Sequence, residues 1–373
     1  MMNSALDEIP GQERVKRTLN NFLQSKLIPH AFLFTGMDGV GKDNAAIQFA
    51  KALISNEKGN DSEKAGRLIE LLQEPYIKLI FPLPRGKNET DSSSSTEKLN
   101  QDELEEVREQ IESKAANPFH KILIPKANAI KINSIRDTKK FLSMDYNEIG
   151  YRFIIISDAH LMNEEAQNAL LKSLEEPPEK VIFILTTPFV SKLRSTIISR
   201  CWKINFDPLS EDEIVQILAE YFEIDKTTAK EVAPFAMGSV QYALNLIEMN
   251  FHNLKEKTVS ILRYSFGRKF NSAFDELNSV LSDQNSVNYP IVVGMIITWL
   301  NDIQRYKLNI KKYFFKDHLE TLEKFDSKFP DVNLNDITNR LDRLSSLPRN
   351  NINPSLLSAN LIFELASVVL NKQ

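Results

Sequence analysis

The chain reads HAFLFTGMDGVGKD over residues 30–43. The first part of this stretch, Ala31–Thr35, is a short apolar run of the kind that forms a buried strand. It leads directly into a glycine-rich loop that ends at Lys42, and a helical pattern follows. A phosphate-binding loop of the G-x-x-x-x-G-K type requires this order of strand, loop and helix. The stretch therefore predicts an α/β domain with a phosphate-binding loop after its first strand.

The loop carries most, but not all, of the groups that nucleotide binding needs. Gly36, Gly39 and Gly41 let backbone N–H groups converge on phosphate oxygens, and the helix N-terminus adds a positive dipole end. Lys42 would reach the terminal phosphates. The next position should carry a Ser or Thr hydroxyl for Mg²⁺, but it carries Asp43, which brings negative charge beside the phosphates. We expect residual ATP or ADP binding at most.

The third predicted strand ends in a second altered site, Ile156-Ser157-Asp158. An active ATPase has an acidic pair here, one carboxylate for Mg²⁺ and one to polarise the attacking water. Ser157 occupies the metal position, and Asp158 stands at the water-activating position with a shorter side chain than Glu. The pattern predicts that hydrolysis is lost, although Asp158 could equally serve only to cap the following turn.

Further apolar runs bounded by turn residues occur within the first 206 residues. Helical patterns lie between them, so strand and helix alternate as a parallel sheet with helices on both faces requires. The expected strands are 31–35, 77–81, 153–156, 181–185 and 203–206, and the clearest helices are 15–23, 45–53, 134–142 and 164–175. Asn163 can cap the last of these helices, and Pro177-Pro178 ends it.

The organisation changes along the chain. A polar stretch at about 84–118 is expected to be an insertion, flexible at serines 92–95 and helical afterwards. After Pro208 the pattern is helical only. Because 373 residues exceed what one hydrophobic core usually organises, we expect several domains: an α/β domain at 1–207, a helical lid at 208–253 and a helical domain at 254–373.

The composition excludes several classes of protein. The net charge of −4 provides no global positive field, so any DNA contact must be local or made through partners. The single cysteine, Cys201, rules out an internal disulfide and suits a reducing compartment, so we expect a cytoplasmic protein. The longest apolar run, residues 289–300, is shorter than the roughly 20 residues of a membrane span, and we expect no membrane contact.

Several motifs in this order resemble the AAA+ clamp-loader family. They are Gly11-Gln12, the strand at 31–35 with its loop, NALLKSLEEPP at 168–178 and Ser199-Arg200-Cys201. The match runs through the first two thirds of the chain. The resemblance implies an AAA+ parallel sheet with helices on both faces, a helical lid, and a helical collar domain through which subunits form a pentameric ring.

The departures resemble the delta-prime branch of this family, whose own ATP site is inactive. Asp43, Ser157 and Gln241 stand where an active gamma/tau-type site carries Thr, Asp and a sensing Arg. The pair Thr186-Thr187 after the fourth strand resembles the sensor 1 region, which implies Thr187 as a nucleotide contact, although Thr pairs that end a strand are common. It also implies that Arg200 reaches the ATP of a neighbouring subunit as an arginine finger, where a guanidinium stabilises the transferred phosphoryl group.

The resemblance implies partners as well as chemistry. A delta-prime-like subunit would join gamma/tau and delta subunits in a loader that places a sliding clamp on primer–template DNA, with ATP hydrolysis in the partner subunits. Two alternatives remain open from the sequence. One is an active gamma/tau-type ATPase in which Asp43 helps to hold Mg²⁺ and Asp158 acts as base, and the other is a nucleotide-free AAA+ scaffold outside replication.

We expect no tightly bound zinc, and no other metal site. A structural zinc site normally needs four Cys or His ligands at close spacing, and no such set lies between Gly41 and Phe119. Metal analysis of protein purified without a His tag should find zinc well below one equivalent. A stoichiometric amount would show that the region folds around ligands that this spacing rule misses.

Overall fold

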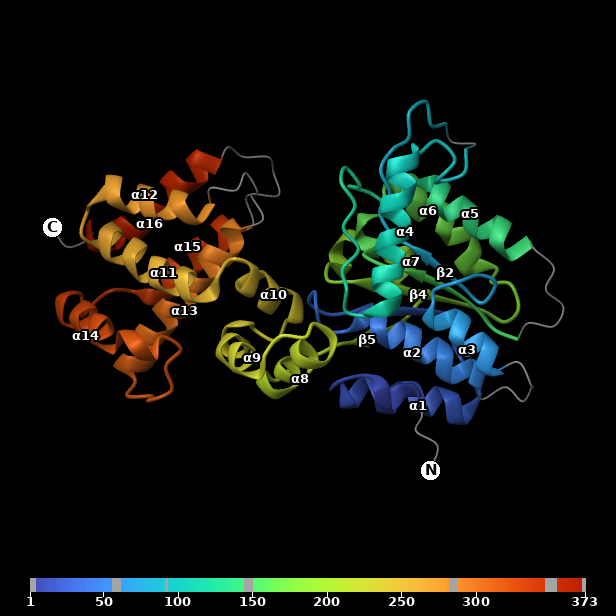
Figure 1. Ribbon diagram of the computed structural model, residues 1–373, viewed down its shortest axis with the longest axis horizontal. Coiled ribbons are helices and arrows are strands. Elements are labelled where there is room, and N and C mark those ends of the chain that lie inside the picture. Colours follow the sequence, from blue (N-terminus) through green and yellow to red (C-terminus); the bar gives the residue numbers. More distant parts are fainter. Residues whose placement is uncertain are drawn as a thin grey trace. The chain divides into compact units, whose positions relative to one another are not determined.

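The computed structural model describes residues 5–55, 62–90, 93–143, 150–281, 288–345 and 354–370. The chain divides into two compact units (Figure 1). The first contains Met1–Asp225 and Gly238–Gln241, and the second contains Lys226–Met237 and Tyr242–Gln373. The predicted division into three domains, with boundaries at 207 and 253, stays a prediction.

The first unit is built on a five-stranded parallel sheet with the order β2-β3-β4-β1-β5. The central strands pair in register, with Phe32 opposite Ile184 across β1 and β4. Because all strands run the same way, their carboxyl ends meet at one edge. The strands are β1 (Ala31–Thr35), β2 (Ile77–Ile80), β3 (Arg152–Ile156), β4 (Val181–Thr187) and β5 (Trp202–Asn205).

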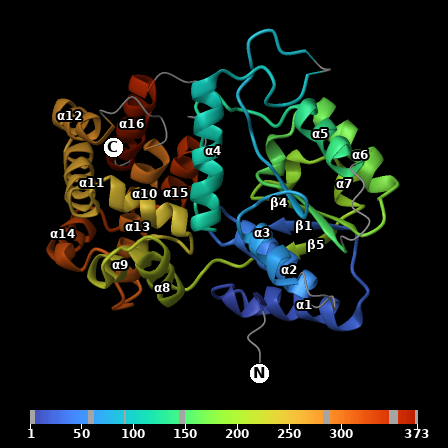
Figure 2. The same cartoon turned by 45° about the vertical axis from the view of Figure 1, so that its right-hand side comes forward.

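Helices cover both faces of this sheet, as predicted. Successive strand side chains point to opposite faces, so Phe32 and Phe34 join one buried core while Ala31 and Leu33 join the other. Figures 1 and 2 show α1 to α3 on one side of the sheet and α5 to α7 on the other. These helices are α1 (Glu13–Ser25), α2 (Lys42–Ser55), α3 (Ser62–Glu70), α5 (Ile132–Ser143), α6 (Glu164–Glu175) and α7 (Ser195–Ile198).

The region predicted as an insertion contains a long helix, α4 (Gln101–Ala116). Asn100 caps it in a capping box with Glu103, which satisfies backbone N–H groups at the helix start. Leu99 and Val107 join a small core with Phe81 and Leu83, so part of the region is tied to the domain. Ser92 lies outside the described residues, and the flexibility predicted for the serine stretch stays a prediction.

Beyond β5 the described chain is helical. Two of these helices carry strong start signals, such as the Ser210 capping box of α8. The helices are α8 (Glu211–Tyr221), α9 (Lys226–Val232), α10 (Val240–Glu248), α11 (Phe251–Phe266), α12 (Phe270–Leu281), α13 (Tyr289–Lys307), α14 (Leu319–Lys328), α15 (Leu334–Ser345) and α16 (Pro354–Leu370). In the described part of the chain, no helix combines the length and the apolar character that crossing a membrane requires.

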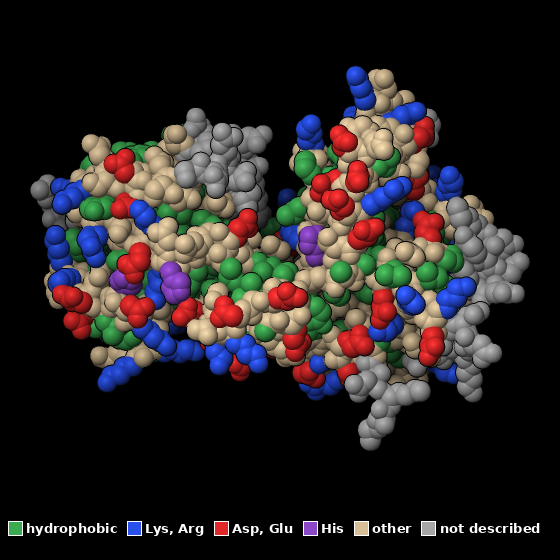
Figure 3. Space-filling model, in the orientation of Figure 1, with side chains coloured by type: hydrophobic (Ala, Val, Ile, Leu, Met, Phe, Trp, Pro, Cys, Tyr) green, Lys and Arg blue, Asp and Glu red, His purple; other side chains and the backbone are tan. Residues whose placement is uncertain are grey.

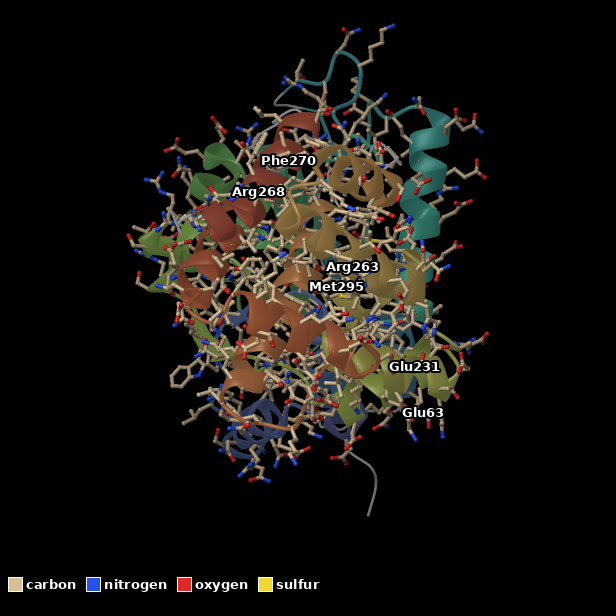
Figure 4. All side chains as sticks on the ribbon, turned by 90° about the vertical axis from the view of Figure 1, so that its left-hand side faces the viewer. Glu63, Glu231, Arg263, Arg268, Phe270 and Met295 are labelled. Carbon is tan, nitrogen blue, oxygen red and sulfur yellow. The ribbon has the colours of Figure 1, made fainter. Side chains whose placement is uncertain are left out.

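The second unit packs around Trp299 of α13, whose ring lies 5.3 Å from that of Phe325. At its surface the ring of Phe270 packs on Phe363, with ring centres 5.5 Å apart. Figure 4 shows Phe270 and Arg268 at the same end of this unit, beside the turn that joins α11 to α12. This helical unit is the part of the chain in which a collar was expected.

A buried carboxylate organises one loop of the second unit. Asp302 is fully buried and accepts hydrogen bonds from the backbone N–H of Phe314 at 2.8 Å and of Phe315 at 2.7 Å. Burial raises the pKa of Asp302, and these two N–H donors and Arg305 oppose that rise. The carboxylate therefore holds the turn that follows α13 against the helix.

Replacing Asp302 with Ala should destabilise the second unit. The change leaves two backbone N–H groups without their acceptor, and unsatisfied buried donors cost about 1–3 kcal/mol each, so we expect a loss of about 2–6 kcal/mol. Denaturant unfolding of the full chain would measure it. Glu323→Ala, at an exposed position of α14, is the matched control and should change stability by less than about 0.5 kcal/mol. Equal stability of both variants would contradict this role for Asp302.

Candidate functional site

The glycine-rich loop lies where the sequence predicts it, between β1 and α2. Gly39 and Gly41 have φ angles of 74° and 86°, a region that favours glycine. Close neighbours add a second reason, because a Cβ on Gly39 would lie 2.4 Å from the backbone nitrogen of Gln241. The loop is thus held against residues 239–241, where the Ser239 hydroxyl also donates to the Asp38 carbonyl at 2.7 Å.

Lys42 is turned back onto its own loop. Its ammonium donates to the carbonyl of Gly36 at 2.8 Å and to that of Met37 at 2.7 Å, and the side chain is 8% exposed. Burial lowers the pKa of Lys42, while Asp38 and Asp43 oppose that change. In this arrangement the ammonium satisfies loop carbonyls, and it would have to leave them to contact a phosphate.

Asp43, at the start of α2, is the centre of a dense polar cluster. One carboxylate oxygen accepts from the Thr186 hydroxyl at 2.7 Å. The other accepts from the Ser157 hydroxyl at 3.0 Å and lies 3.2 Å from the ammonium of Lys114. Burial by itself would raise the pKa of Asp43, but the charge of Lys114 and the bond from Thr186 outweigh it and hold that pKa below its usual value.

The parallel sheet explains how distant residues meet at Asp43. Ser157 follows β3 and Thr186 lies near the end of β4, so both occupy the carboxyl edge of the sheet, beside the loop that follows β1. Lys114 comes from the last turn of α4 and its side chain is 4% exposed. The two altered positions that the sequence singles out, 43 and 157, are therefore in direct contact with each other.

A second ion-pair group lies beside the first. The ammonium of Lys121 is 2.8 Å from an Asp38 carboxylate oxygen and 4.0 Å from one of Asp158. Burial raises the pKa of Asp158, and Asp38 and Asp43 add to this effect while Lys121 opposes it. Burial would also raise the pKa of Asp38, but Lys121 outweighs it and lowers that pKa. Asp158 has a left-handed backbone conformation, with φ 52°.

The remaining predicted residues fall in different places. Thr187 is buried, and its hydroxyl accepts from the backbone N–H of Phe189 at 3.0 Å, so it closes its own turn while the neighbouring Thr186 contacts Asp43. Gln241 lines the same small cavity as Lys42 and Asp158. The side chain of Asp158 makes no hydrogen bond that caps the following turn, so the alternative expectation that Asp158 serves only as a cap is wrong.

Arg200 is separate from this cluster and does not line its cavity. One guanidinium nitrogen donates to the Thr196 carbonyl at 2.9 Å, and another lies 2.9 Å from a carboxylate oxygen of Glu175. The Arg200 side chain is 34% exposed. The thiol of the adjacent Cys201 stays protonated, because burial raises the pKa of Cys201 to about 12. Two predicted motifs, the end of 168–178 and the triplet 199–201, thus meet through one ion pair.

The sequence reasoning missed Lys114, Lys121 and Asp38. Lys114 lies in a stretch interpreted as an insertion, and a single lysine in a charged helix carries no local signal. One clue was present, since a carboxylate at position 43, inside the glycine-rich loop and helix start, is stabilised by a nearby cation. Among the residues that the structure describes, no group of three or more His, Cys, Asp or Glu side chains is arranged to hold a metal ion.

Two family models match different parts of this chain. The family model described as "DNA polymerase III, delta subunit" matches residues 11–210, and "DNA polymerase III, delta subunit, C terminal" matches 263–367. Among solved structures, a gamma subunit-related protein from Thermotoga maritima covers 94% of this chain and 99% of its own, at 16% identity and a TM-score of 0.42. RuvB of Thermotoga maritima covers 66% of this chain and 65% of its own, at 15% identity and a TM-score of 0.38.

Curated relatives include DNA polymerase III subunits named tau and gamma. The tau subunit of Bacillus subtilis is 32% identical over 248 residues, which are 65% of this chain and 37% of that protein. A gamma subunit of Buchnera aphidicola is 29% identical over 246 residues, or 65% of this chain and 57% of that protein. The chain thus spans less than two thirds of the length of these relatives. Since the first family model covers more than half of the chain, the chain belongs to the family of delta-type DNA polymerase III clamp-loader subunits, related to gamma and tau.

Proposed function

We propose that this chain is a largely non-hydrolysing, delta-prime-like clamp-loader subunit that supplies Arg200 to the ATP of a neighbouring subunit. The contacts of Asp43 are the observation that carries the proposal. In an active site of this type, a hydroxyl at this position helps to hold Mg²⁺. Here a carboxylate takes its place, and two hydroxyls and an ammonium from the same chain surround it.

The residues at the other catalytic positions also support the loss of ATP hydrolysis at this site. Ser157, at the metal position, is engaged with Asp43 and offers no carboxylate to a metal. Asp158, at the position of the water-activating group, lies near Lys121, and burial, with a further contribution from Asp38 and Asp43, raises its pKa. Lys42 is occupied by loop carbonyls. Removing the metal ligand, the base and the phosphate contact together would leave little of the barrier lowering that phosphoryl transfer requires.

Arg200 supports the second half of the proposal. Its guanidinium is partly exposed and fixed on one side by Glu175 and the Thr196 carbonyl. A fork held in this way keeps donors available for a phosphate group approaching from outside. Since Arg200 does not line the cavity of its own loop, the phosphate it would serve belongs to another subunit.

The proposed partners follow from the family. They are gamma/tau and delta subunits in a pentameric ring, a sliding clamp, and primer–template DNA reached through the complex, in the cytoplasm. Direct DNA contact through α4 is disfavoured, because its exposed face is rich in Asp and Glu (Figure 3). An active gamma/tau-type ATPase is the second candidate, favoured by the retained loop glycines and Lys42 and by the names of the curated relatives.

The isolated chain should hydrolyse ATP negligibly. Asp43, Ser157 and Gln241 replace the hydroxyl, the metal ligand and the sensing arginine, so any measured turnover should be independent of Lys42. Steady-state phosphate release by the wild-type chain and by Lys42→Ala would measure this. Turnover comparable with that of an active loader, and abolished in Lys42→Ala, would instead support the gamma/tau-type ATPase.

Arg200→Ala should impair the assembled loader while leaving this chain folded. An arginine finger in related phosphoryl-transfer enzymes is worth several orders of magnitude, so we expect clamp loading and clamp-stimulated ATPase to fall roughly tenfold or more. Arg200→Lys should rescue poorly, because an ammonium cannot reproduce the planar fork. The measurement is DNA- and clamp-stimulated ATPase of reconstituted complexes, with assembly checked by size.

The matched control for this experiment is Arg194→Ala. Arg194 immediately precedes α7, the short helix that ends just before Arg200, and it is 44% exposed and pairs with Glu164. Its loss therefore tests for an unspecific effect of removing a surface arginine. It should retain nearly full loader activity. Full activity of Arg200→Ala together with a large loss in Lys42→Ala would reverse the assignment.

A further inference from the structure

The segment Lys114–Lys121, called the plug segment here, lies against the phosphate-binding loop. Its first residue, Lys114, donates to the carbonyls of Pro118 at 2.7 Å and His120 at 2.8 Å, and its ammonium also faces Asp43. One ammonium thereby closes the end of α4 into a compact turn and joins that turn to the loop. With 4% of the Lys114 side chain exposed, this contact is internal.

The rest of the plug segment covers the loop. Phe119 packs so close to Gly41 that a Cβ there would lie 3.2 Å from its ring. The ring of Phe119 packs against that of Tyr221 in a tilted arrangement, with ring centres 5.1 Å apart, and the Asn117 side chain donates to the Tyr221 carbonyl at 2.7 Å. Lys121 ends the segment with its ion pair to Asp38. Contacts with Gly41, Tyr221 and Asp38 therefore hold the plug segment over the loop.

The charges and the free volume of the site leave little room for a nucleotide. Three ammonium groups, on Lys42, Lys114 and Lys121, face three carboxylates, on Asp38, Asp43 and Asp158. The cavity that remains among these residues has a volume of about 60 Å³. Pockets that bind small molecules usually measure about 300–1,000 Å³. The site has room for a few water molecules and has no excess positive charge to attract a triphosphate.

We propose that the plug segment is a built-in occupant of the phosphate-binding loop. The Lys114 ammonium takes the place of the metal ion beside Asp43, and Phe119 and Lys121 close the loop, so that nucleotide is excluded even though the glycines and Lys42 are retained. This inference rests on the proposed function and extends it. The proposed function explains the lack of hydrolysis by missing catalytic groups, whereas the plug segment would also fill the site with a part of the same chain.

Opening the site should restore nucleotide binding. The opened variant combines Asp43→Thr, Lys114→Ala and Phe119→Ala, which restores the loop hydroxyl, removes the paired charges together and clears the cover. The matched control is Asp43→Asn with Lys114→Met, which removes the same two charges but keeps the site filled. We expect titration with fluorescently labelled ADP and Mg²⁺ to give saturable binding to the opened variant, at least tenfold tighter than to wild type or to the filled control.

A thermal unfolding cycle on the full chain tests the same contact without nucleotide. Lys114→Met removes the nearest cation from Asp43, whose side chain is only 23% exposed, and breaking this largely internal pair should lower the melting temperature by roughly 5 °C. Adding Asp43→Asn to Lys114→Met should recover more than half of that loss. Arg108→Ala, at an exposed position of the same helix, should shift the melting temperature by less than about 2 °C.

Three results would overturn the inference. The first is nucleotide binding to wild type that is as tight as binding to the opened variant, and the second is no binding to an opened variant that is folded. The third is a thermal cycle in which Lys114→Met causes no loss of melting temperature, and this result decides the matter if the opened variant fails to fold. Both tests use the isolated chain, so their failure leaves the trans role of Arg200 untouched, and failure of the Arg200 test leaves the plug segment untouched.

Discussion

The neutralisation of Asp43 is the constraint on which the rest of the site depends. A carboxylate that is 23% exposed at the start of α2, with most of its surface turned into the protein, is stabilised when its charge is paired and its oxygens are hydrogen-bonded. Lys114 supplies the charge, and Ser157 and Thr186 supply the bonds. These partners come from the insertion and from the ends of two strands, so one side chain links α2, the sheet and α4.

The sheet makes this linkage possible. The central strands β1, β3 and β4 contribute alternate side chains to two separate cores. This alternation fixes the register of each strand, and therefore the position of the residues at its carboxyl end. Ser157 follows the apolar strand β3 and Thr186 lies near the end of the apolar strand β4, so their hydroxyls are positioned by packing that does not involve charge. The polar cluster is precise because the apolar layers beneath it are rigid.

Much of this architecture could be predicted from the sequence. The apolar runs predicted the strands to within about two residues, and α6 has the predicted bounds 164–175 with Asn163 capping it through the N–H of Ala166. Local patterns of this kind are read from neighbouring residues. The glycine loop and its altered positions were also predicted, since their spacing is local.

The partner of Asp43 could not be predicted in this way. The chain contains 46 Lys and Arg residues, and periodicity does not say which of them closes on a given carboxylate. The packing that buries Lys114 depends on Leu99 and Val107 docking the insertion, and these two apolar residues are weak signals within a polar stretch. The same limit applies to the choice between Thr186 and Thr187, because adjacent strand residues point to opposite faces and only the packed sheet decides which hydroxyl meets Asp43.

The pairing of Asp43 with Lys114 also has an evolutionary consequence. A single change of Asp43 to a hydroxyl residue would leave Lys114 buried without its counter-charge, and a single change at Lys114 would leave the carboxylate unpaired. Each residue thus makes the other difficult to replace, so changing both without leaving a charge unpaired would require linked substitutions 71 positions apart in the chain. Such mutual dependence, or epistasis, would favour retention of the Asp43–Lys114 pair as a unit.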